Sequence, residues 1–321
     1  METLYLIVPC YNEEEVLRET AVRTAEKLTA LISSGMVSQK SRVFFVDDGS
    51  TDRTWEIISG ICRDNVIYSG IRLSHNCGQQ NALLAGLMQA REYADITVSV
   101  DADLQDDLDV IDMMLAERQN GSEIVYGVKA PIHNEKIHRR LLADGFYRFI
   151  QIIGVDMVSH HSSCRLMGSR AMDALSGYSE VNIFLPALVH LLGFSSSVVH
   201  YKQNERFAGK TKYSIKKLFL LAMEAITSFS LKPLRLINLA AMLCLLIFGG
   251  IAVYDIFTAF AGTFKGWLLV LASVWAVGGI LLLSVGVAGE YVGKTYLEAK
   301  QRPRYFIAEE LPDTNKYTEK E

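Results

Sequence analysis

Two long apolar runs near the C-terminal end restrict the fold of this chain more than any other feature. They cover about residues 236–260 and 267–288, and Asp255 is the only charged residue in either run. Each run exceeds the ~20 residues with which a helix crosses the hydrocarbon core of a bilayer. A buried helix pair in a soluble protein is the alternative, but both runs are too long and too apolar for it. We therefore expect a transmembrane hairpin over residues 234–290.

The basic residues around these runs predict how the hairpin is oriented. Lys232 and Arg235 precede it, four lysines and arginines follow it between residues 294 and 304, and the loop between the runs has only Lys265. Loops rich in Lys and Arg remain on the cytoplasmic side of a membrane. Both termini, including the tail over residues 291–321, are therefore expected in the cytoplasm, and the chain is expected to be a multi-pass membrane protein.

An amphipathic stretch over residues 214–233 comes directly before the hairpin. Lys216 and Lys217 lie beside a face of Leu, Phe and Met residues. A helix of this composition can lie in the interface between bilayer and water. We expect this segment to rest on the cytoplasmic membrane surface.

The first 213 residues alternate between strand and helix patterns. The expected strands are residues 4–8, 43–46, 67–73, 96–100, 123–127 and, late in this part of the chain, 198–201. Strands that alternate with helices predict an open, largely parallel sheet with helices on both faces. The sequence therefore predicts a Rossmann-like α/β domain over residues 1–213.

Polar loops follow four of these strands. They cover residues 11–13, 47–52, 75–80 and 101–105. Ligands of open parallel sheets bind outside the carboxyl ends of the strands. The shared position of the four loops therefore predicts a binding site at that edge of the sheet.

The composition excludes several classes of protein. A net charge of −4 and a pI of about 6.0 give no sign of a nucleic-acid partner. The sequence lacks G-x-G-x-x-G after the first strand and G-x-x-x-x-G-K-[ST] anywhere, which argues against a dinucleotide oxidoreductase and a P-loop NTPase. Five scattered cysteines without CxxC spacing indicate reduced thiols rather than a disulfide framework or a zinc site.

The loop after the strand at residues 96–100 carries two aspartates in i, i+2 spacing. In extended chain, Asp101 and Asp103 point to the same side, and the small Ala102 between them leaves room for a ligand. Hard oxygen ligands suit Mg²⁺ or Mn²⁺ shared with substrate phosphates. The alternative is an acidic turn in which Asp103 or Asp106 caps the following helix.

A basic loop around Gly209 precedes the amphipathic stretch. Arg206, Lys210 and Lys212 lie within residues 205–213. A solvated linker is the commoner meaning of such charge. The functional interpretation is a mobile lid that brings these cations onto phosphate groups.

These motifs together resemble a known family of enzymes. The segments that carry the resemblance are residues 8–13, 47–52, 76–79, 101–105, 206–213 and 289–293. The chain resembles the polyprenyl-phosphate glycosyltransferases, in the family-two GT-A group that includes dolichyl-phosphate mannose synthase. It is most similar to the bacterial two-helix members, which are the bactoprenol glucosyltransferases and the undecaprenyl-phosphate aminoarabinose-type transferases. The resemblance covers nearly the whole chain.

The resemblance implies roles for individual residues. The expected contacts to the nucleotide base and ribose are Pro9, Tyr11, Glu13 and Asp48. The expected ligands of Mg²⁺ or Mn²⁺ on the diphosphate are Asp101, Asp103 and Gln105. The further expected substrate contacts are Gln79, Ala102, Arg139, Ser163, Arg165 and Lys210. Catalytic roles are expected for Asp101, Asp103, Arg206 and Lys212, of which the last two would hold the lipid phosphate or close the lid.

The resemblance also implies an activity. It is the inverting transfer of a sugar from a nucleotide diphosphate, with uridine preferred over guanosine, to undecaprenyl phosphate at the cytoplasmic face of the bacterial plasma membrane. The product would serve modification of a cell-envelope glycan, and the enzyme would be a homo-oligomer, often a tetramer. A processive polysaccharide synthase is a rival, but the chain has no Arg-Trp pair of the Q-x-x-R-W motif. A non-catalytic membrane scaffold is a second rival, against which the intact Asp101/Asp103 pair argues.

Two segments depart from the family pattern. Many bacterial members carry Asp-Phe-Arg-Leu where this chain has Ser163-Cys164-Arg165-Leu166. The aspartate has been proposed as a base, and no carboxylate occupies its position here. Lys129-Ala130-Pro131 likewise replaces an arginine-rich segment after the strand at residues 123–127.

Overall fold

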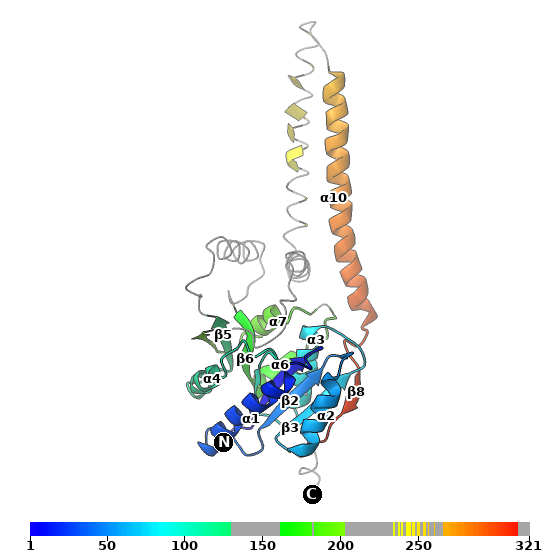
Figure 1. The fold of residues 1–321 in the computed structure, drawn as a ribbon. Helices are drawn as coiled ribbons and strands as arrows, with labels where there is room; N and C mark the ends of the chain where they lie inside the picture. Colours follow the sequence, from blue (N-terminus) through cyan, green and yellow to red (C-terminus); the bar gives the residue numbers. More distant parts are fainter. Residues whose placement is uncertain are drawn as a thin grey trace. The chain divides into compact units, whose positions relative to one another are not determined.

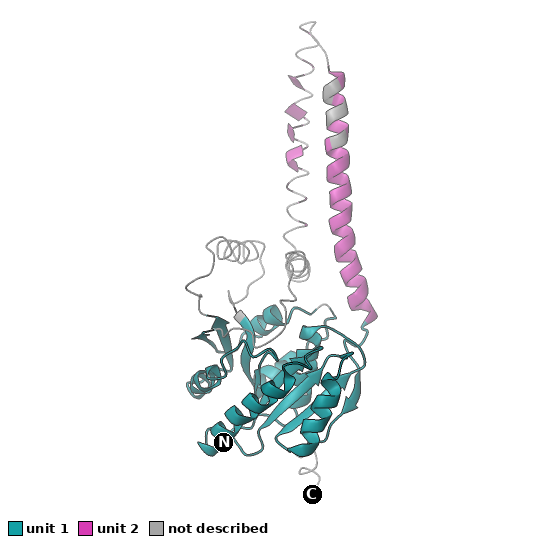
Figure 2. Cartoon of the chain, viewed as in Figure 1, with its two compact units in different colours: residues 1–148, 156–213, 301–321 teal, residues 149–155, 214–300 magenta. Residues whose placement is uncertain are grey.

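The computed structural model describes residues 1–129, 161–181, 183–202 and 266–313, together with individual positions between 234 and 260. The chain divides into two compact units (Figure 2). One comprises residues 1–148, 156–213 and 301–321, and the other comprises residues 149–155 and 214–300. The basic loop, the amphipathic stretch and Arg139 lie outside the described residues, so these predictions stay predictions.

The first unit is built around an eight-stranded mixed sheet in the order β7-β5-β6-β4-β1-β2-β3-β8 (Figure 1). The strands are β1 (Leu4–Cys10), β2 (Arg42–Asp47), β3 (Tyr68–Leu73), β4 (Ile96–Ser99), β5 (Ile124–Lys129), β6 (His161–Gly168), β7 (Ser196–Tyr201) and β8 (Ile307–Glu310). β1 pairs in parallel with β2 and β4, β2 with β3, and β5 with β7. β6 and β8 run antiparallel to their neighbours. The predicted α/β fold with a largely parallel sheet is confirmed.

Helices cover both faces of this sheet. They are α1 (Leu17–Ser33), α2 (Thr54–Asp64), α3 (Gln79–Ala90), α4 (Val110–Gln119), α6 (Ser169–Ser176) and α7 (Leu185–Leu191). β1 alternates between the faces: Leu4, Leu6 and Val8 belong to one core cluster with residues of α1, α2 and α4. The other face is packed by α3, which contacts β1, β2 and α6 (Figure 1).

Close packing of α3 on the sheet depends on a glycine. A Cβ atom added at Gly86 would lie 2.5 Å from Ile7 Cγ2 and 2.8 Å from Val46 Cγ2. Both distances are far inside van der Waals contact, so a larger residue would push α3 away from the sheet. Because α3 begins at Gln79, its position also decides where the loop before it lies.

The strand β8 joins the sheet of the first unit from the far end of the sequence. It pairs antiparallel with β3, with Arg72 opposite Glu309. Beyond β8, the Leu311 N–H donates to the Gly70 carbonyl at 2.9 Å, and the buried Tyr5 hydroxyl donates to Asp313 at 2.8 Å. The sequence predicted only a tail here, because four residues with two glutamates show no strand pattern.

The described part of the second unit is mainly α10 (Trp267–Lys300). The predicted run at 267–288 lies within this helix. Residues 276–300 form a helix long and apolar enough to cross a membrane, and none of its apolar window is buried. Only individual positions of the run at 236–260 are described, each of them helical. The second span of the hairpin therefore stays a prediction.

Candidate active site

Hydrogen bonds connect the four polar loops at the carboxyl ends of β1 to β4. The loop after β1 meets that after β2, since the Asn12 N–H donates to Ser50 Oγ at 3.0 Å and the Thr51 N–H donates to Asn12 Oδ1 at 2.9 Å. The Glu13 N–H donates to Thr54 Oγ1 at 3.0 Å. The structure thus brings the predicted loops together at one edge of the sheet.

The side chain of Asn12 connects loops instead of capping a helix. α1 begins at Leu17, preceded by Val16, and Asn12 itself takes a left-handed backbone conformation with φ of 51°. Asn tolerates this conformation better than most residues. Its amide oxygen is thereby turned towards Thr51.

The carboxylate of Asp48 organises the loop after β3. It accepts from the Cys77 N–H at 2.7 Å and from the Gly78 N–H at 2.9 Å. Burial raises the pKa of Asp48, while the two N–H donors lower it. Gly49, with φ of +63°, passes so close to this loop that a Cβ would lie 2.5 Å from the backbone carbon of His75. Asp48, a predicted contact to the nucleotide, therefore also fixes the loop after β3.

Asp101 lies at the centre of the remaining contacts. Its Oδ1 accepts from the Gln79 amide at 3.0 Å, and its Oδ2 accepts from the Ser163 hydroxyl at 2.5 Å. Burial, followed by repulsion from Asp106, raises the pKa of Asp101 to about 6, and Asp103 contributes in the same direction. Three residues that the sequence proposed for substrate binding are therefore joined directly.

The Asp101–Gln105 loop is held in a compact turn. The Gln105 N–H donates to Asp103 Oδ1 at 3.2 Å, and Leu104 takes a left-handed conformation with φ of 57°. The Thr20 hydroxyl of α1 donates to the Ala102 carbonyl at 2.7 Å. The helix-capping alternative is wrong, because α4 begins at Val110 with no side-chain capping hydrogen bond.

The donor set of this loop fits a divalent cation. The raised pKa of Asp101 reflects buried negative charge, which a bound cation would relieve. Among the described residues, no group of three or more His, Cys, Asp or Glu side chains could hold a metal ion. Mg²⁺ is commonly held by one or two carboxylates with water and substrate phosphate. Asp101 and Asp103, with the Gln105 amide, match that pattern.

The other predicted site residues lie in different surroundings. Tyr11 is exposed in the loop after β1, and Pro9 belongs to β1 itself. Arg165 is buried in β6, where its guanidinium lies 5.1 Å from the ring centroid of Tyr126. Burial lowers the pKa of Arg165. The structure therefore places Ser163, but not Arg165, in hydrogen-bond contact with the Asp101 loop.

Two partnerships near the loops were missed by sequence reasoning. The fully buried Asp47 lies 3.3 Å from Arg72 of β3. Asp106 accepts a hydrogen bond from Tyr201 at 2.5 Å and lies 3.4 Å from Lys129. The sequence did point towards both aspartates, because Asp47 is adjacent to Asp48 and Asp106 is adjacent to Gln105, which are predicted site residues. Their partners come from distant strands, which sequence spacing does not reveal.

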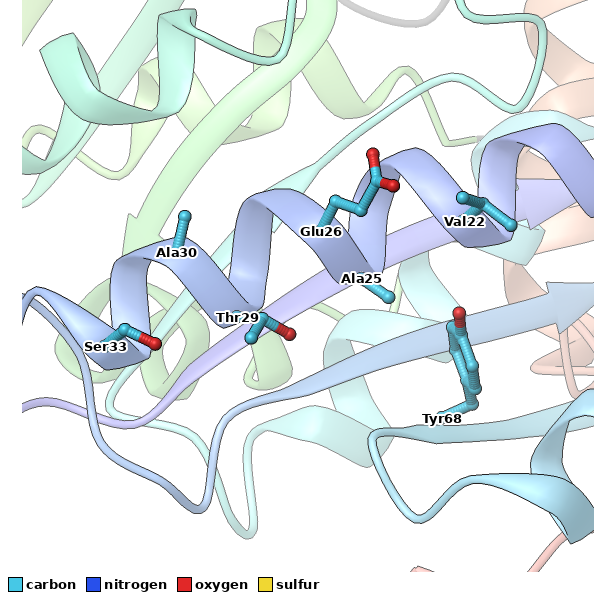
Figure 3. Close-up of a pocket in the computed structure, with 7 residues that line it drawn as sticks. All are labelled: Val22, Ala25, Glu26, Thr29, Ala30, Ser33 and Tyr68. Atoms are coloured by element: carbon cyan, nitrogen blue, oxygen red, sulfur yellow. The ribbon is translucent and has the colours of Figure 1, made fainter.

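A surface hollow of about 530 Å³ lies away from these loops (Figure 3). Its lining residues are Val22, Ala25, Glu26, Thr29, Ala30, Ser33 and Tyr68. Tyr68 is the first residue of β3, whereas the polar loop follows its last residue, Leu73. The hollow therefore lies along α1 towards the opposite edge of the sheet.

The mostly parallel mixed sheet, its helices on both faces and the paired aspartates after β4 define a GT-A-like α/β domain. Residues 5–174 match the family described as "Glycosyl transferase family 2". The chain belongs to this family and is a glycosyltransferase.

Relatives match along almost the whole chain. The Bacillus subtilis (strain 168) glycosyltransferase YkoT is 40% identical over 305 residues, covering 95% of this chain and 90% of the relative. The "Prophage bactoprenol glucosyl transferase homolog" of Escherichia coli (strain K12) is 32% identical, covering 94% and 97%. Among solved structures, the mannosyltransferase PcManGT of Pyrobaculum calidifontis is 17% identical with a TM-score of 0.44, covering 92% of this chain and 85% of that chain.

Proposed function

We propose that this glycosyltransferase transfers a sugar, with inversion, from a UDP-sugar to undecaprenyl phosphate at the cytoplasmic face of the plasma membrane. The observation that carries the proposal is the Asp101 site, where Gln79 after β3 and Ser163 within β6 both donate to one carboxylate in the loop after β4. Relatives named bactoprenol glucosyl transferase, 30–31% identical over nearly the whole chain, support a lipid-linked acceptor. The exposed apolar helix α10 supports contact with a membrane.

The donor half of the site would hold the nucleotide diphosphate. The loops around Tyr11, Glu13 and Asp48 would hold the base and ribose, as the resemblance implies. A Mg²⁺ or Mn²⁺ ion on Asp101, Asp103 and Gln105 would neutralise charge on the leaving diphosphate. The Gln79 amide would keep the Asp101 carboxylate turned towards that ion.

The acceptor requires no carboxylate base in this proposal. A phosphate monoester has a second pKa near 6, so it already carries an anionic oxygen at neutral pH. Ser163 would hold Asp101 in place instead of removing a proton. The proposed phosphate-binding cations are Arg139, Arg206, Lys210 and Lys212, outside the described residues.

The proposal extends to the arrangement of the whole enzyme. It includes a two-helix membrane hairpin, cytoplasmic termini and a homo-oligomer, as the sequence and its resemblance predict. The processive polysaccharide synthase is the competing activity, since it shares the GT-A domain. It would extend a glycan chain, whereas the proposed enzyme adds one sugar to one lipid phosphate.

The test is a donor screen with the full-length protein in lipid nanodiscs. UDP-glucose, UDP-N-acetylglucosamine and GDP-mannose are offered with undecaprenyl phosphate, and undecaprenol serves as the matched acceptor without phosphate. We expect one sugar per lipid phosphate, from a UDP donor only, and no product with undecaprenol. Products with several sugars would support the processive synthase instead.

The metal part of the proposal has a separate control. Asp103→Ala should abolish transfer, an effect worth several kcal/mol of transition-state stabilisation. Asp109→Ala removes an exposed carboxylate on the same segment, paired with Lys27 at 2.8 Å, and should leave transfer unchanged. Undiminished wild-type turnover in EDTA would show that no metal takes part.

A further inference from the structure

A buried carboxylate beyond the metal loop has no role in the proposed function. Asp106 is only 3% exposed. The Tyr201 hydroxyl donates to its Oδ1 at 2.5 Å, and Lys129 Nζ lies 3.4 Å from the same oxygen. Within the part of the chain that the structure describes, its Oδ2 is buried without a hydrogen-bond partner. Burying a carboxylate is costly, so this one calls for an explanation.

The three residues connect parts of the sheet that are not neighbours. Lys129 and Tyr201 are the last residues of β5 and β7, and they lie opposite each other in the register of these parallel strands. Asp106 comes from the loop after β4, and β6 separates β4 from β5 in the sheet. The carboxylate of Asp106 thus reaches across one strand to two strand ends.

Asp106 also closes the turn that carries the predicted metal ligands. At the start of this turn, Thr20 holds the Ala102 carbonyl at 2.7 Å. In its middle, Leu104 has a φ of 57°. A left-handed conformation at a non-glycine residue costs free energy and persists only where the surroundings impose it. Thr20 holds the backbone on the N-terminal side of Leu104, and the contacts of Asp106 hold it on the C-terminal side.

We propose that Asp106, held by Tyr201 and Lys129, is a positioning residue that fixes the Asp101–Gln105 loop for metal and diphosphate binding. The inference rests on the proposed function. A ligand role suits Asp106 less well, because one oxygen is occupied by Tyr201 and Lys129 and the other is buried. The charged carboxylate gives the Tyr201 hydrogen bond more strength than a neutral acceptor would.

The test compares two tyrosines that each lose one hydroxyl. Tyr201→Phe removes the donor to Asp106. Tyr68→Phe is the matched control, because Tyr68 is also a buried strand residue and its hydroxyl donates to the Ala21 carbonyl at 3.0 Å. Binding of Mn²⁺ to the UDP-loaded full-length protein is measured by calorimetry, which requires no turnover. We expect Tyr201→Phe to weaken Mn²⁺ binding by about tenfold or more and Tyr68→Phe to change it less than twofold.

Variants of the aspartate separate positioning from direct ligation and remain informative if Tyr201→Phe fails to fold. Asp106→Asn keeps an acceptor oxygen for Tyr201, so it should bind Mn²⁺ more tightly than Asp106→Ala. Equal and complete loss in both variants, with Tyr201→Phe unaffected, would make Asp106 a ligand and overturn the proposal. Equal effects of Tyr201→Phe and Tyr68→Phe would overturn it too. If the wild type itself binds no Mn²⁺ with UDP, the proposed function fails instead.

Discussion

Two neutral donors, the Gln79 amide and the Ser163 hydroxyl, hold the carboxylate of Asp101 among other acids. This arrangement stabilises the orientation of Asp101 more than its charge, since burial and Asp106 still raise its pKa to about 6. A site of this kind is ready for a cation. In the metal-free protein, ionisation of this carboxylate should therefore cost free energy and lower the free energy of unfolding.

This cost predicts a pH-dependent effect of Asp101→Asn. Between pH about 4 and 6 the folded chain binds a proton at Asp101 that the unfolded chain has released, so stability of the metal-free protein falls as pH rises through this window. The neutral amide avoids the loss. Relative to the wild type, Asp101→Asn should gain up to about 3 kcal/mol between pH 4 and pH 7.5.

Thermal unfolding in EDTA at both pH values measures that gain. Asp109→Asn, which changes an exposed carboxylate, is the control. A difference between wild type and Asp101→Asn that does not change with pH would contradict the assigned pKa.

A second residue-scale prediction concerns Ser163→Ala. Because the phosphate acceptor needs no base, transfer should stay within about tenfold of the wild type, or ~1.4 kcal/mol. The Ser163 hydroxyl lowers the pKa of Asp101 in the metal-free protein, so its removal raises that pKa. Protons and Mn²⁺ compete for this carboxylate, so at subsaturating Mn²⁺ the acid limb of activity should move to higher pH. Single-turnover transfer against pH tests this.

Ser162→Ala is the matched control for Ser163→Ala. Its hydroxyl is also buried but donates to the Gly127 carbonyl at 3.2 Å, so its loss should leave the acid limb in place. A decrease of several orders of magnitude in Ser163→Ala alone would show that Ser163 is essential to the chemistry.

At this scale the sequence predicted the residues of the Asp101 contacts, but not the partners of Asp106. The i, i+2 spacing singled out Asp101 and Asp103, and the resemblance added Gln79 and Ser163, both of which the structure joins to Asp101. The partners of Asp106 were not predictable. Its hydrogen bond to Tyr201 spans 95 positions of the sequence, and only the register of the folded sheet brings the two together.

At the scale of elements, the strands β1 to β5 and β7 were predicted, and β6 and β8 were not. The predicted strands are apolar runs bounded by polar loops, and burial from both faces of a sheet demands that pattern. β6 includes Ser162 and Ser163, which interrupt its apolar pattern. β8 has four exposed residues, so its backbone pairing with β3, and not burial of its side chains, holds it in the sheet.

The pairing of β8 with β3 leads to a prediction about Arg72. This side chain meets two carboxylates: Asp47 at 3.3 Å, which is fully buried, and Glu309 at 3.0 Å, which is about half exposed. Removing the partner of a buried charge costs far more than removing an exposed one. Arg72→Met should therefore lower the melting temperature by several degrees, and Glu309→Gln by less than about 2 °C.

Glu310→Gln is the control for Glu309→Gln, because Glu310 lies on the same strand opposite Ile71. Thermal unfolding in detergent gives the comparison. If Glu309→Gln destabilised the protein as much as Arg72→Met, the exposed pair would be the important one, and burial would not be the deciding factor.

At the scale of the whole molecule, the chain leaves the α/β unit and returns to it. Residues 301–321 belong to the same compact unit as residues 1–148. The hydrogen bond from Tyr5 to Asp313 joins two residues 308 positions apart. A chain that leaves the sheet before the apolar runs and rejoins it after α10 fits a hairpin that crosses the membrane twice, because both ends of such a hairpin lie on one side.

That topology can be tested by chemical labelling of two single-cysteine additions. Lys265→Cys lies in the predicted loop between the two apolar runs, and Arg302→Cys lies in the segment that returns to the sheet. If the hairpin crosses the membrane twice, a membrane-impermeant maleimide applied to intact cells should label Lys265→Cys only. Arg302→Cys should react only after the membrane is permeabilised, because basic flanking segments remain in the cytoplasm. The unmodified chain, with its five native cysteines, gives the background. Protection of Lys265→Cys in intact cells, with labelling after permeabilisation, would place the loop inside the cell and replace the hairpin with a helix pair that does not span the bilayer.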